Sequence, residues 1–437
     1  MKLEIKKAGI NGEGIGFYKR KPVFVEGCFP DEIVECELTD CGRHYEGKLS
    51  RVLKKSPYRI KPVCPHFRKC GGCTLMTLEY EEQLRIKKQL LEGALFKYAD
   101  YKDPVDDIVE SPKLYKYRNK CNLPVVMHDG RLCNALYKQG SNHPAIIDNC
   151  LIHDERVEEI RKEILGILNK HKYPVYIHKE KTGIRQIVVR GFENEYQAVL
   201  ITGKDEIGKE IISDLKQIKG LCSICQGINI HKNPVQLMPE KLRLLSGKKK
   251  ITMKTGDYKL CLSPQAFFQL NHDQAERIYS DVSSLIKDRK KLIVEAYCGI
   301  GAISMYLHDR ADKLIGIEVI DRAIEDAREN AKLNGFDNLE FICDDASKAI
   351  RRLVKKQKID VLIVDPPRTG LDDELLTTLL KTSVKEVIYV SCNPSTLGKD
   401  LGILKNRYKI ETIKGYDMFP HTPLVEAVVY LTNKKDK

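Results

Sequence analysis

The sequence lacks the features that would place the protein in or beyond a membrane. It contains no run of about 18 apolar residues, so we expect no membrane-spanning helix. Its first residues, MKLEIKKAGINGEG, lack the apolar core of a secretory signal peptide. Without such a signal, its 15 cysteines point to reduced thiols, metal binding or catalysis rather than to disulfides. We therefore expect a cytoplasmic protein.

Internal repeats and low-complexity tracts are also absent, and the composition is that of a soluble globular protein. Apolar residues make up 42% of the 437 residues and charged residues 31%. A chain of this length is too long for one hydrophobic core, so we expect two or three domains. Lys and Arg outnumber Asp and Glu by 74 to 61, which gives a net charge of +13. This excess favours a polyanionic partner, although a generally basic enzyme would show it too. We expect neither a membrane nor an obligate protein partner.

Local patterns divide the chain into three regions. Residues 1–58 hold short β-like runs broken by glycine and charge, which indicates a small OB-like β-barrel. Residues 59–252 mix a cysteine-rich turn region, a charged helix near residues 79–98 and later β-rich stretches, so a mixed α+β domain is expected. We expect the helical part near residues 79–112 to pack on the last region. Residues 253–437 alternate strand and helix patterns, which is typical of an α/β fold with a mostly parallel, doubly wound sheet.

The strand candidates of the last region are LIVEAY, KLIGIEV, LEFICDD, VLIVD and VIYVSC. Between them, DRAIEDARENAKLNG places Ala323, Ala327 and Ala331 on one helical face. Gly335 follows where a glycine commonly ends a helix.

A glycine-rich turn after the first of these strands predicts a cofactor site. In EAYCGIGAIS, Gly299 and Gly301 allow the backbone to approach a ligand at a helix N-terminus. The turn lacks the GxGxxG spacing, and no GKS or GKT follows, so a nucleoside triphosphate is poorly supported. Glu318 ends the second strand, where an acid can accept from ribose hydroxyls. Asp344 and Asp345 end the third strand and could meet an adenine amino group. Together these features indicate S-adenosylmethionine.

Two further strand ends carry candidate catalytic groups. Asp365 ends the fourth strand in VDPPRTG, and Cys392 ends the fifth in IYVSCNPST. A DPP turn is also found in amino-methyltransferases, but those place an aromatic residue where this chain has Arg368. Methylation of uracil explains the cysteine, because carbon 5 becomes nucleophilic only after a thiolate adds to carbon 6. Such a cysteine needs a lowered pKa or deprotonation in place, and a carboxylate must later remove the carbon 5 proton. Glu426, at the start of the last strand, is the candidate carboxylate.

Three motifs together, DPPRTG, IYVSCNPST and DMFPHTPLVE, resemble those of the RNA uracil-5-methyltransferase family. The resemblance covers essentially the whole chain and implies a class I, Rossmann-like methyltransferase domain in residues 253–437. It implies Cys392 as the nucleophile and Glu426 as the base. It also implies methyl-donor contacts from Gln269, Tyr297, Glu318 and Asp365. The chain departs from the family at Leu424, where members usually carry a histidine.

The segment CPHFRKCGGC suggests a metal site, because it spaces Cys64, Cys70 and Cys73 as C-x5-C-x2-C. Cys150 is the fourth candidate ligand. The family resemblance implies that these four hold a 4Fe–4S cluster, with zinc or no metal as the alternatives. The pair in CSIC (residues 222–225) lies on a predicted strand, where residues three apart point to opposite faces. The remaining cysteines show no ligand pattern: Cys28, Cys36, Cys41, Cys121, Cys133, Cys261, Cys298 and Cys343.

The segment KLYKYRNKCN interleaves cations and tyrosines, the mixture expected for RNA phosphate contacts and base stacking. Arg118 and Lys120 in this segment, together with Arg368, are the candidate RNA-binding residues. By resemblance, residues 1–58 are expected to be a TRAM-type RNA-binding domain, and the substrate is expected to be 23S rRNA. The alternatives are a tRNA 5-methyluridine enzyme and a non-catalytic RNA chaperone on the same fold.

Overall fold

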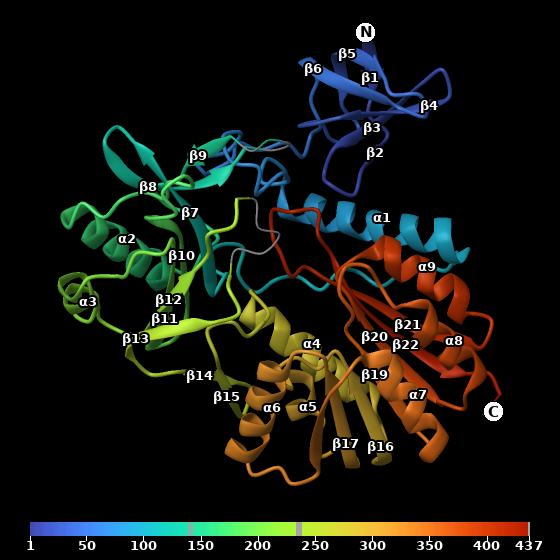
Figure 1. The fold of residues 1–437 in the computed structure, drawn as a ribbon. Coiled ribbons are helices and arrows are strands. Elements are labelled where there is room, and N and C mark those ends of the chain that lie inside the picture. Colours follow the sequence, from blue (N-terminus) through green and yellow to red (C-terminus); the bar gives the residue numbers. More distant parts are fainter. Residues whose placement is uncertain (139–140, 142, 233–237, 436–437) are drawn as a thin grey trace. The chain divides into compact units, whose positions relative to one another are not determined.

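The computed structural model describes residues 1–435 with the exception of 139–140, 142 and 233–237. The chain divides into two compact units. Unit 1 comprises residues 1–67, 72–112 and 350–437, and unit 2 comprises residues 68–71 and 113–349. Figure 1 shows the elements of both units, coloured along the sequence from blue at the N-terminus to red at the C-terminus.

Unit 1 begins with a six-stranded sheet in the order β1-β5-β6-β4-β3-β2. Its strands are β1 (Lys2–Glu4), β2 (Lys7–Ala8), β3 (Gly14–Tyr18), β4 (Lys21–Val25), β5 (Ile33–Asp40) and β6 (Tyr45–Lys54). Burial alternates along β5, because Val34 and Cys36 are fully buried whereas Glu37 is exposed. With Leu3, Val23 and Val25 they form a small separate core.

The rest of unit 1 combines a long helix with four strands. Its elements are α1 (Tyr80–Ala99), β19 (Val361–Val364), α8 (Asp373–Lys381), β20 (Glu386–Ser391), α9 (Pro394–Leu404), β21 (Tyr408–Tyr416) and β22 (Glu426–Asn433). The strand order is β19-β20-β22-β21, with β19 and β20 parallel and the other pairs antiparallel. Helix α1 lies along α9 (Figure 1). Gly398 of α9 permits the close contact, because a Cβ there would lie 2.8 Å from the carbonyl oxygen of Ala94.

A buried ion pair on α1 supports the loop that leads to Glu426. The side chains of Lys87 and Asp417 are both fully buried and form this pair. The Lys87 ammonium also donates to the carbonyl of Phe419 at 3.0 Å. The Tyr80 hydroxyl donates to Asp417 at 2.8 Å. These contacts hold the start of residues 417–425, so α1 fixes the backbone that carries the candidate base.

We expect Lys87→Met to lower the apparent free energy of unfolding by about 3–5 kcal/mol, because it leaves the Asp417 carboxylate buried without a counter-charge. Urea denaturation at neutral pH measures the change. Lys88→Met is the matched control, since Lys88 pairs with the exposed Asp107 and should cost less than about 1 kcal/mol. Equal losses in the two variants would contradict the structural role of the buried pair.

Unit 2 contains a seven-stranded sheet in the order β13-β12-β11-β10-β7-β8-β9. Its elements are β7 (Lys120–His128), β8 (Arg131–Tyr137), β9 (Pro144–Ile146), α2 (Glu155–Lys170), β10 (Ile184–Phe192), β11 (Glu195–Thr202), α3 (Lys209–Leu215), β12 (Leu221–Ile228) and β13 (Leu242–Gly247). Helices α2 and α3 cover one face and share its core (Figure 1). The predicted strand at CSIC is confirmed as β12, with Cys225 buried in the second, smaller core of the sheet.

The remainder of unit 2 is α/β. It consists of the hairpin β14 (Ile251–Thr255) and β15 (Tyr258–Leu262), then α4 (His272–Leu285), β16 (Lys290–Ala296), α5 (Ala302–Tyr306), β17 (Ala311–Glu318), α6 (Asp321–Leu333) and β18 (Leu339–Cys343). α7 (Ala346–Lys356) follows and ends in unit 1. Strands β18, β17 and β16 are parallel neighbours, which confirms the predicted α/β fold class.

Two details of this α/β part were also expected from the sequence. The predicted face of α6 is confirmed, because Ala323, Ala327 and Ala331 are buried. Gly335, just beyond the helix end, has a φ of 74°. Among the helices of the described residues, none is both long and apolar enough to cross a membrane.

Candidate active site

Three strand ends of unit 1 bring a thiol and two carboxyl groups together. Asp365 directly follows β19, Cys392 directly follows β20, and Glu426 begins β22. The antiparallel pairing of β20 with β22 places Ser391 opposite Ala427. Cys392 and Glu426 therefore occupy the next position of the same ladder. The predicted nucleophile and base thus lie side by side, although they are 34 residues apart in the sequence.

Burial makes all three groups favour their neutral forms. It raises the pKa of Asp365 to about 7. Burial and, secondarily, the charge of Asp365 raise the pKa of Glu426 to about 8, and the nearby Arg368 guanidinium opposes this. The pKa of Cys392 rises to about 11 because of burial first, then Glu426 and Asp365. The site therefore holds protons tightly when no substrate is bound.

The chemistry allowed either a lowered pKa for Cys392 or its deprotonation in place. The raised pKa favours deprotonation in place, because two acidic neighbours and a half-buried position disfavour the thiolate. Asp365 and Glu426 are the neighbouring groups that can accept the proton in their ionised forms.

Helix α9 holds the loop that carries Arg368. Asn393 caps the helix by accepting from the Ser395 amide at 3.1 Å, and its side-chain amide donates to the Arg368 carbonyl at 2.9 Å. The Thr396 hydroxyl donates to the same carbonyl at 3.2 Å. The polar residues that follow Cys392 thus fix the DPPRTG turn beside it. Leu424, in the place of the usual family histidine, is half-buried.

In unit 2, the predicted cofactor turn has the backbone that ligand approach requires. Gly299 and Gly301 have φ values of 53° and 78°, and Tyr297 has a φ of 62°, which is strained for a tyrosine. The Glu318 carboxylate accepts from the Gly299 amide at 3.2 Å and so ties the turn to the end of β17. A Cβ on Gly299 would meet no atom within 4 Å, so the space beside this residue is open. This turn fits a bound nucleoside.

Two other predicted cofactor residues have structural contacts of their own. Asp345 caps α7, because its carboxylate accepts from the Lys348 amide at 3.0 Å. The half-buried Gln269 lies in the loop before α4, and its backbone carbonyl accepts a hydrogen bond from the side-chain amide of Asn119 at 2.9 Å. Capping accounts for one oxygen of Asp345, and Asn119 fixes the position of Gln269.

The predicted RNA-binding residues Arg118 and Lys120 are half-buried and belong to a cluster of three cations in unit 2. The third member is Arg190, which lies directly opposite Lys120 in the β7–β10 ladder and is 2% exposed. Burial and then the charge of Arg190 lower the pKa of Lys120 to about 7. Within the described part of the chain, Nε and Nη1 of Arg190 and Nε of Arg118 have no hydrogen-bond partner. Such a cluster favours an anion.

The sequence analysis missed Arg190, although a cation in the otherwise apolar run QIVVRGF was a usable signal. Two other cations of KLYKYRNKCN form ion pairs at the surface. Lys113 pairs with Asp273 at 2.8 Å, and Lys116 pairs with Glu155 at 2.9 Å. The segment therefore contains exposed cations that form ion pairs and half-buried cations that lie next to Arg190.

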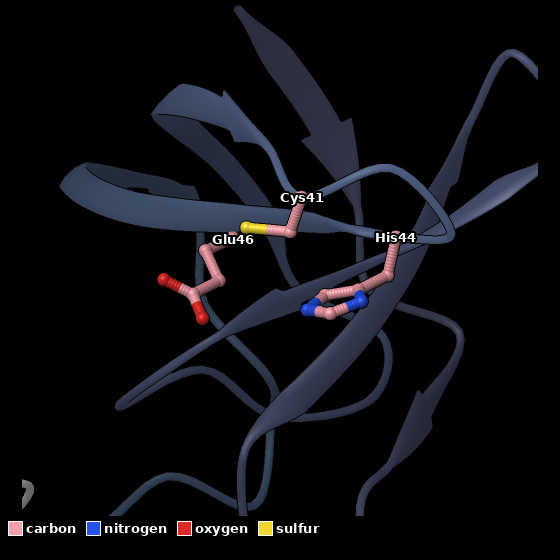
Figure 2. Close-up of side chains that lie close together, drawn as sticks. All are labelled: Cys41, His44 and Glu46. Atoms are coloured by element: carbon pink, nitrogen blue, oxygen red, sulfur yellow. The ribbon is translucent and has the colours of Figure 1, made fainter.

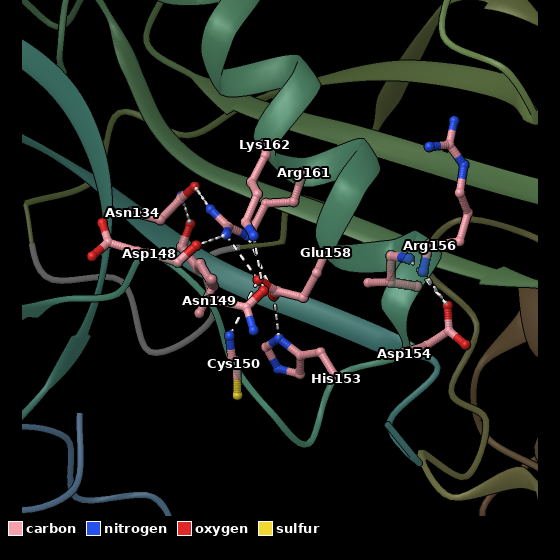
Figure 3. Close-up of polar contacts among 12 residues, drawn as sticks. Asn134, Asp148, Asn149, Cys150, His153, Asp154, Arg156, Glu158, Arg161 and Lys162 are labelled. Atoms are coloured by element: carbon pink, nitrogen blue, oxygen red, sulfur yellow. Dashed lines mark hydrogen bonds and ion pairs between the residues drawn. The ribbon is translucent and has the colours of Figure 1, made fainter. Parts of the chain in front are cut away.

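The four predicted cluster cysteines are all half-buried, and none is in a disulfide: Cys64, Cys70, Cys73 and Cys150. Figure 3 shows a polar network centred on Glu158, which lies beside the backbone of Cys150. The Glu158 carboxylate accepts from the Cys150 amide at 3.2 Å, from Nδ1 of His153 at 2.7 Å and from Arg161 at 2.8 Å. Arg161 in turn donates to Asn134 at 2.7 Å. The network fixes the backbone of the turn that carries Cys150.

The same network favours the thiolate of Cys150. Burial by itself would raise the pKa of this thiol, but the hydrogen bond and charge of His153 outweigh burial and hold the pKa below its usual value. Hydrogen bonds with His153 and Arg161 likewise overcome burial and lower the pKa of Glu158 to about 2. A thiolate of this kind is the donor that iron–sulfur clusters require.

Comparisons with known proteins show the family of the chain. The sequence model of the tRNA (uracil-5-)-methyltransferases matches residues 79–434. An uncharacterised RNA methyltransferase of Bacillus anthracis is 40% identical over 444 residues, which cover 99% of this chain and 96% of the relative. One from Streptococcus pneumoniae strain R6 is 36% identical over 446 residues, covering 99% and 98%.

Among solved structures, the Pyrococcus abyssi tRNA (uracil-54, C5)-methyltransferase in complex with S-adenosyl-L-homocysteine is similar along its whole length. It has 27% sequence identity and a TM-score of 0.79, and the match covers 99% of this chain and 100% of that chain. The chain therefore belongs to the tRNA (uracil-5-)-methyltransferase family, and it is an RNA methyltransferase that uses S-adenosylmethionine.

Proposed function

We propose that the protein methylates carbon 5 of a uridine in RNA, with Cys392 as the nucleophile and Glu426 as the base. The observation that carries this proposal is the pairing of β20 with β22, which puts the thiol next to a buried carboxyl group. Methylation of an amino group would need neither the Cys392 thiol nor the Glu426 carboxylate. Conjugate addition to uracil uses both.

The reaction begins with loss of the Cys392 proton to a neighbouring carboxylate. The thiolate adds to carbon 6 of uracil, which converts carbon 5 into an enolate carbon. S-adenosylmethionine supplies the methyl group that carbon 5 then accepts. The Glu426 carboxylate removes the remaining proton from carbon 5, the double bond re-forms, and the Cys392 sulfur leaves carbon 6. The raised pKa of Glu426 makes it a stronger base than an exposed glutamate.

We expect kcat/KM to rise as the pH increases through about 8, because Glu426 is active only as the carboxylate and its pKa is about 8. Single-turnover rates between about pH 6 and 9 measure this rise, which is the ascending limb of the pH–rate profile. The apparent pKa of the limb belongs to the coupled Asp365–Glu426 pair. Arg368 lowers the pKa of Glu426, so Arg368→Met at saturating RNA should move the limb to higher pH. A limb that moves to lower pH in this variant would contradict the assignment.

For the methyl donor, we propose contacts from six residues: Gln269, Tyr297, Gly299, Glu318, Asp345 and Asp365. The open space beside Gly299 and the carboxylate of Glu318 at the end of β17 support a ribose position there. One carboxylate oxygen of Asp345 already accepts from the Lys348 amide at the N-terminus of α7. We therefore expect Asp345 to contribute least to binding of the methyl donor.

For RNA, we propose Arg118, Lys120 and Arg368 as contacts, and we add Arg190. A uridine must leave its stack to reach Cys392, which costs a few kcal/mol. Binding of an anionic group at the Lys120–Arg190 pair would relieve the repulsion between these cations and help to offset that cost. We further propose that residues 1–58 form a TRAM-type RNA-binding domain, residues 59–252 a central domain and residues 253–437 the methyltransferase domain.

We also propose that Cys64, Cys70, Cys73 and Cys150 hold a 4Fe–4S cluster. The donor set of four cysteines that form no disulfide and the thiolate-favouring surroundings of Cys150 support it. When bound, such a cluster supplies four metal–thiolate cross-links. In this proposal, the chain's own network at Glu158 holds one of those thiolates in place.

We expect Glu158→Gln to reduce cluster loading by about 10–100-fold in affinity, because it removes the charge that fixes His153, Arg161 and the Cys150 backbone. Iron and acid-labile sulfide per chain, after anaerobic purification, measure the loading. Glu159→Gln is the matched control, since Glu159 is exposed and forms a surface ion pair with Arg156 at 2.9 Å. Full loading of the Glu158 variant would refute the positioning role.

The proposed substrate is 23S rRNA, and a specific observation keeps tRNA as the second candidate. The archaeal enzyme named for uracil 54 of tRNA is matched along 100% of its chain, so its length includes counterparts of the N-terminal region. The presence of that region therefore does not separate the two substrates.

Tritium release tests the function and the substrate together. Transcripts of 23S rRNA and of tRNA carrying tritium at uracil carbon 5 are incubated separately with the protein and S-adenosylmethionine. We expect release from the rRNA. Release from tRNA alone would keep the chemistry and change the substrate, whereas no release from either would overturn the proposal.

A further inference from the structure

The hairpin between β5 and β6 gathers three metal-ligand side chains that the methylation chemistry does not use. Donor atoms of Cys41, His44 and Glu46 all lie within 4.8 Å of one another. Figure 2 shows the three side chains on the same side of this hairpin, around one common space. Among the described residues, these side chains form a compact group of three possible metal ligands. The sequence alone gave no ligand pattern for Cys41.

Local hydrogen bonds fix the turn that presents these donors. The Cys41 amide donates to the His44 carbonyl at 2.9 Å and closes the loop between the last strand pair, Asp40 and Tyr45. The Gly42 amide donates to the Asp40 carboxylate at 2.8 Å, and Gly42 takes a φ of 82°. The backbone on both sides of the donors is therefore set before any ligand binds.

The side chains are also left available. The His44 ring packs edge-on against Phe24, with 5.4 Å between ring centroids, which limits its rotation. Lys21 of the neighbouring strand β4 forms an ion pair with Asp40 at 3.4 Å. Glu46 has no ion pair among the residues that the structure describes, and Cys41 is in no disulfide. Cys41 and Glu46 are exposed, so an ion can enter without unfolding the barrel.

The donor types select the ion. A thiolate, an imidazole and a carboxylate are the ligand classes of zinc, whereas magnesium and calcium prefer oxygen alone. Three protein ligands leave the fourth tetrahedral position to water. Thiolate and carboxylate together carry two negative charges, which balance a divalent ion. We propose that Cys41, His44 and Glu46 bind a zinc ion at the β5–β6 hairpin, a site separate from the methyltransferase chemistry.

Titration of the full-length protein with Co²⁺, followed by displacement with Zn²⁺, tests the site. Thiolate-to-cobalt charge transfer in the near ultraviolet reports a cysteine ligand. The variants are Cys41→Ser, His44→Ala and Glu46→Gln, and Cys343→Ser is the matched control because Cys343 is also exposed. Circular dichroism confirms folding, and iron content confirms that cluster loading is equal across the set.

We expect the parent and Cys343→Ser to bind one equivalent that zinc displaces, and Cys41→Ser to lose the charge-transfer band. Loss of a side chain that only supports a metal ligand weakens metal binding by about 10–100-fold. His44→Ala and Glu46→Gln each remove a direct ligand, so each should weaken binding by at least as much. An unchanged band in Cys41→Ser would assign the metal to other cysteines and overturn the proposal. Binding that depends on Cys41 but is unaffected by both other variants would reduce the site to a single thiol and overturn it as well.

Discussion

Replacing Cys392 with alanine is expected to abolish RNA methylation, with a loss of at least about 10⁴-fold in single-turnover rate. Without addition at carbon 6, carbon 5 of uracil has no electron pair to offer a methyl group. The structure places no other thiol of unit 1 beside Glu426 in the β20–β22 ladder. The measurement is transfer of a labelled methyl group to RNA by anaerobically purified protein.

The variant should remain folded and should still bind RNA and the methyl donor, because the side chains that tie α9 to the DPPRTG turn are Asn393 and Thr396, which both donate to the Arg368 carbonyl. Cys343→Ser, at the exposed end of β18, is the matched control and should retain full activity. Residual methylation above about 1% in Cys392→Ala would require direct transfer without a covalent intermediate, and the proposed mechanism would then fail.

Glu426→Gln is expected to stop the reaction at a later point. Cys392 can still add and carbon 5 can still accept the methyl group, but no carboxylate remains to remove the proton from carbon 5. We expect turnover to fall by about 10²–10⁴-fold, with a covalent protein–RNA adduct accumulating. Denaturing gel electrophoresis with labelled RNA detects the adduct. The double variant with Cys392→Ala should form none, and an adduct in that variant would contradict the assignment of the nucleophile.

The same substitution should stabilise the fold at neutral and higher pH. Because the folded-state pKa of Glu426 is about 8, above the usual 4.5, the folded protein binds a proton more tightly than the unfolded chain. Stability is therefore complete below about pH 4.5 and is lost progressively as the pH rises to about 8. Glutamine cannot ionise, so it avoids a penalty of up to about 3 kcal/mol at pH 7.

Thermal melting of the parent and of Glu426→Gln, compared at pH 5 and pH 8, checks this sign. The variant should melt higher at pH 8, and the difference should shrink at pH 5. Equal melting temperatures at pH 8 would mean that Glu426 is ionised at little cost, and the base would then be weaker than proposed. Such a trade of stability for activity is common at catalytic sites.

The sequence by itself determined the elements and the residue types at their ends. The helix pattern of residues 321–333 and the order of strands β16 to β20 follow from local periodicity, which short stretches of chain express alone. Cys392 and Glu426 could be predicted as site residues for the same reason, because the ends of strands can be recognised in the sequence and the motifs there are local. Family membership followed from these motifs and is confirmed.

The tertiary structure decided the properties that depend on distant neighbours. The pKa of Cys392 is raised by burial and by carboxyl groups on two other strands, so its direction could not be read from IYVSCNPST. Lys87 and Asp417 are 330 residues apart, and Arg190 meets Lys120 only through the pairing of β10 with β7. Burial and charge–charge interactions are set by whichever groups the fold brings together, and a local pattern carries no information about them.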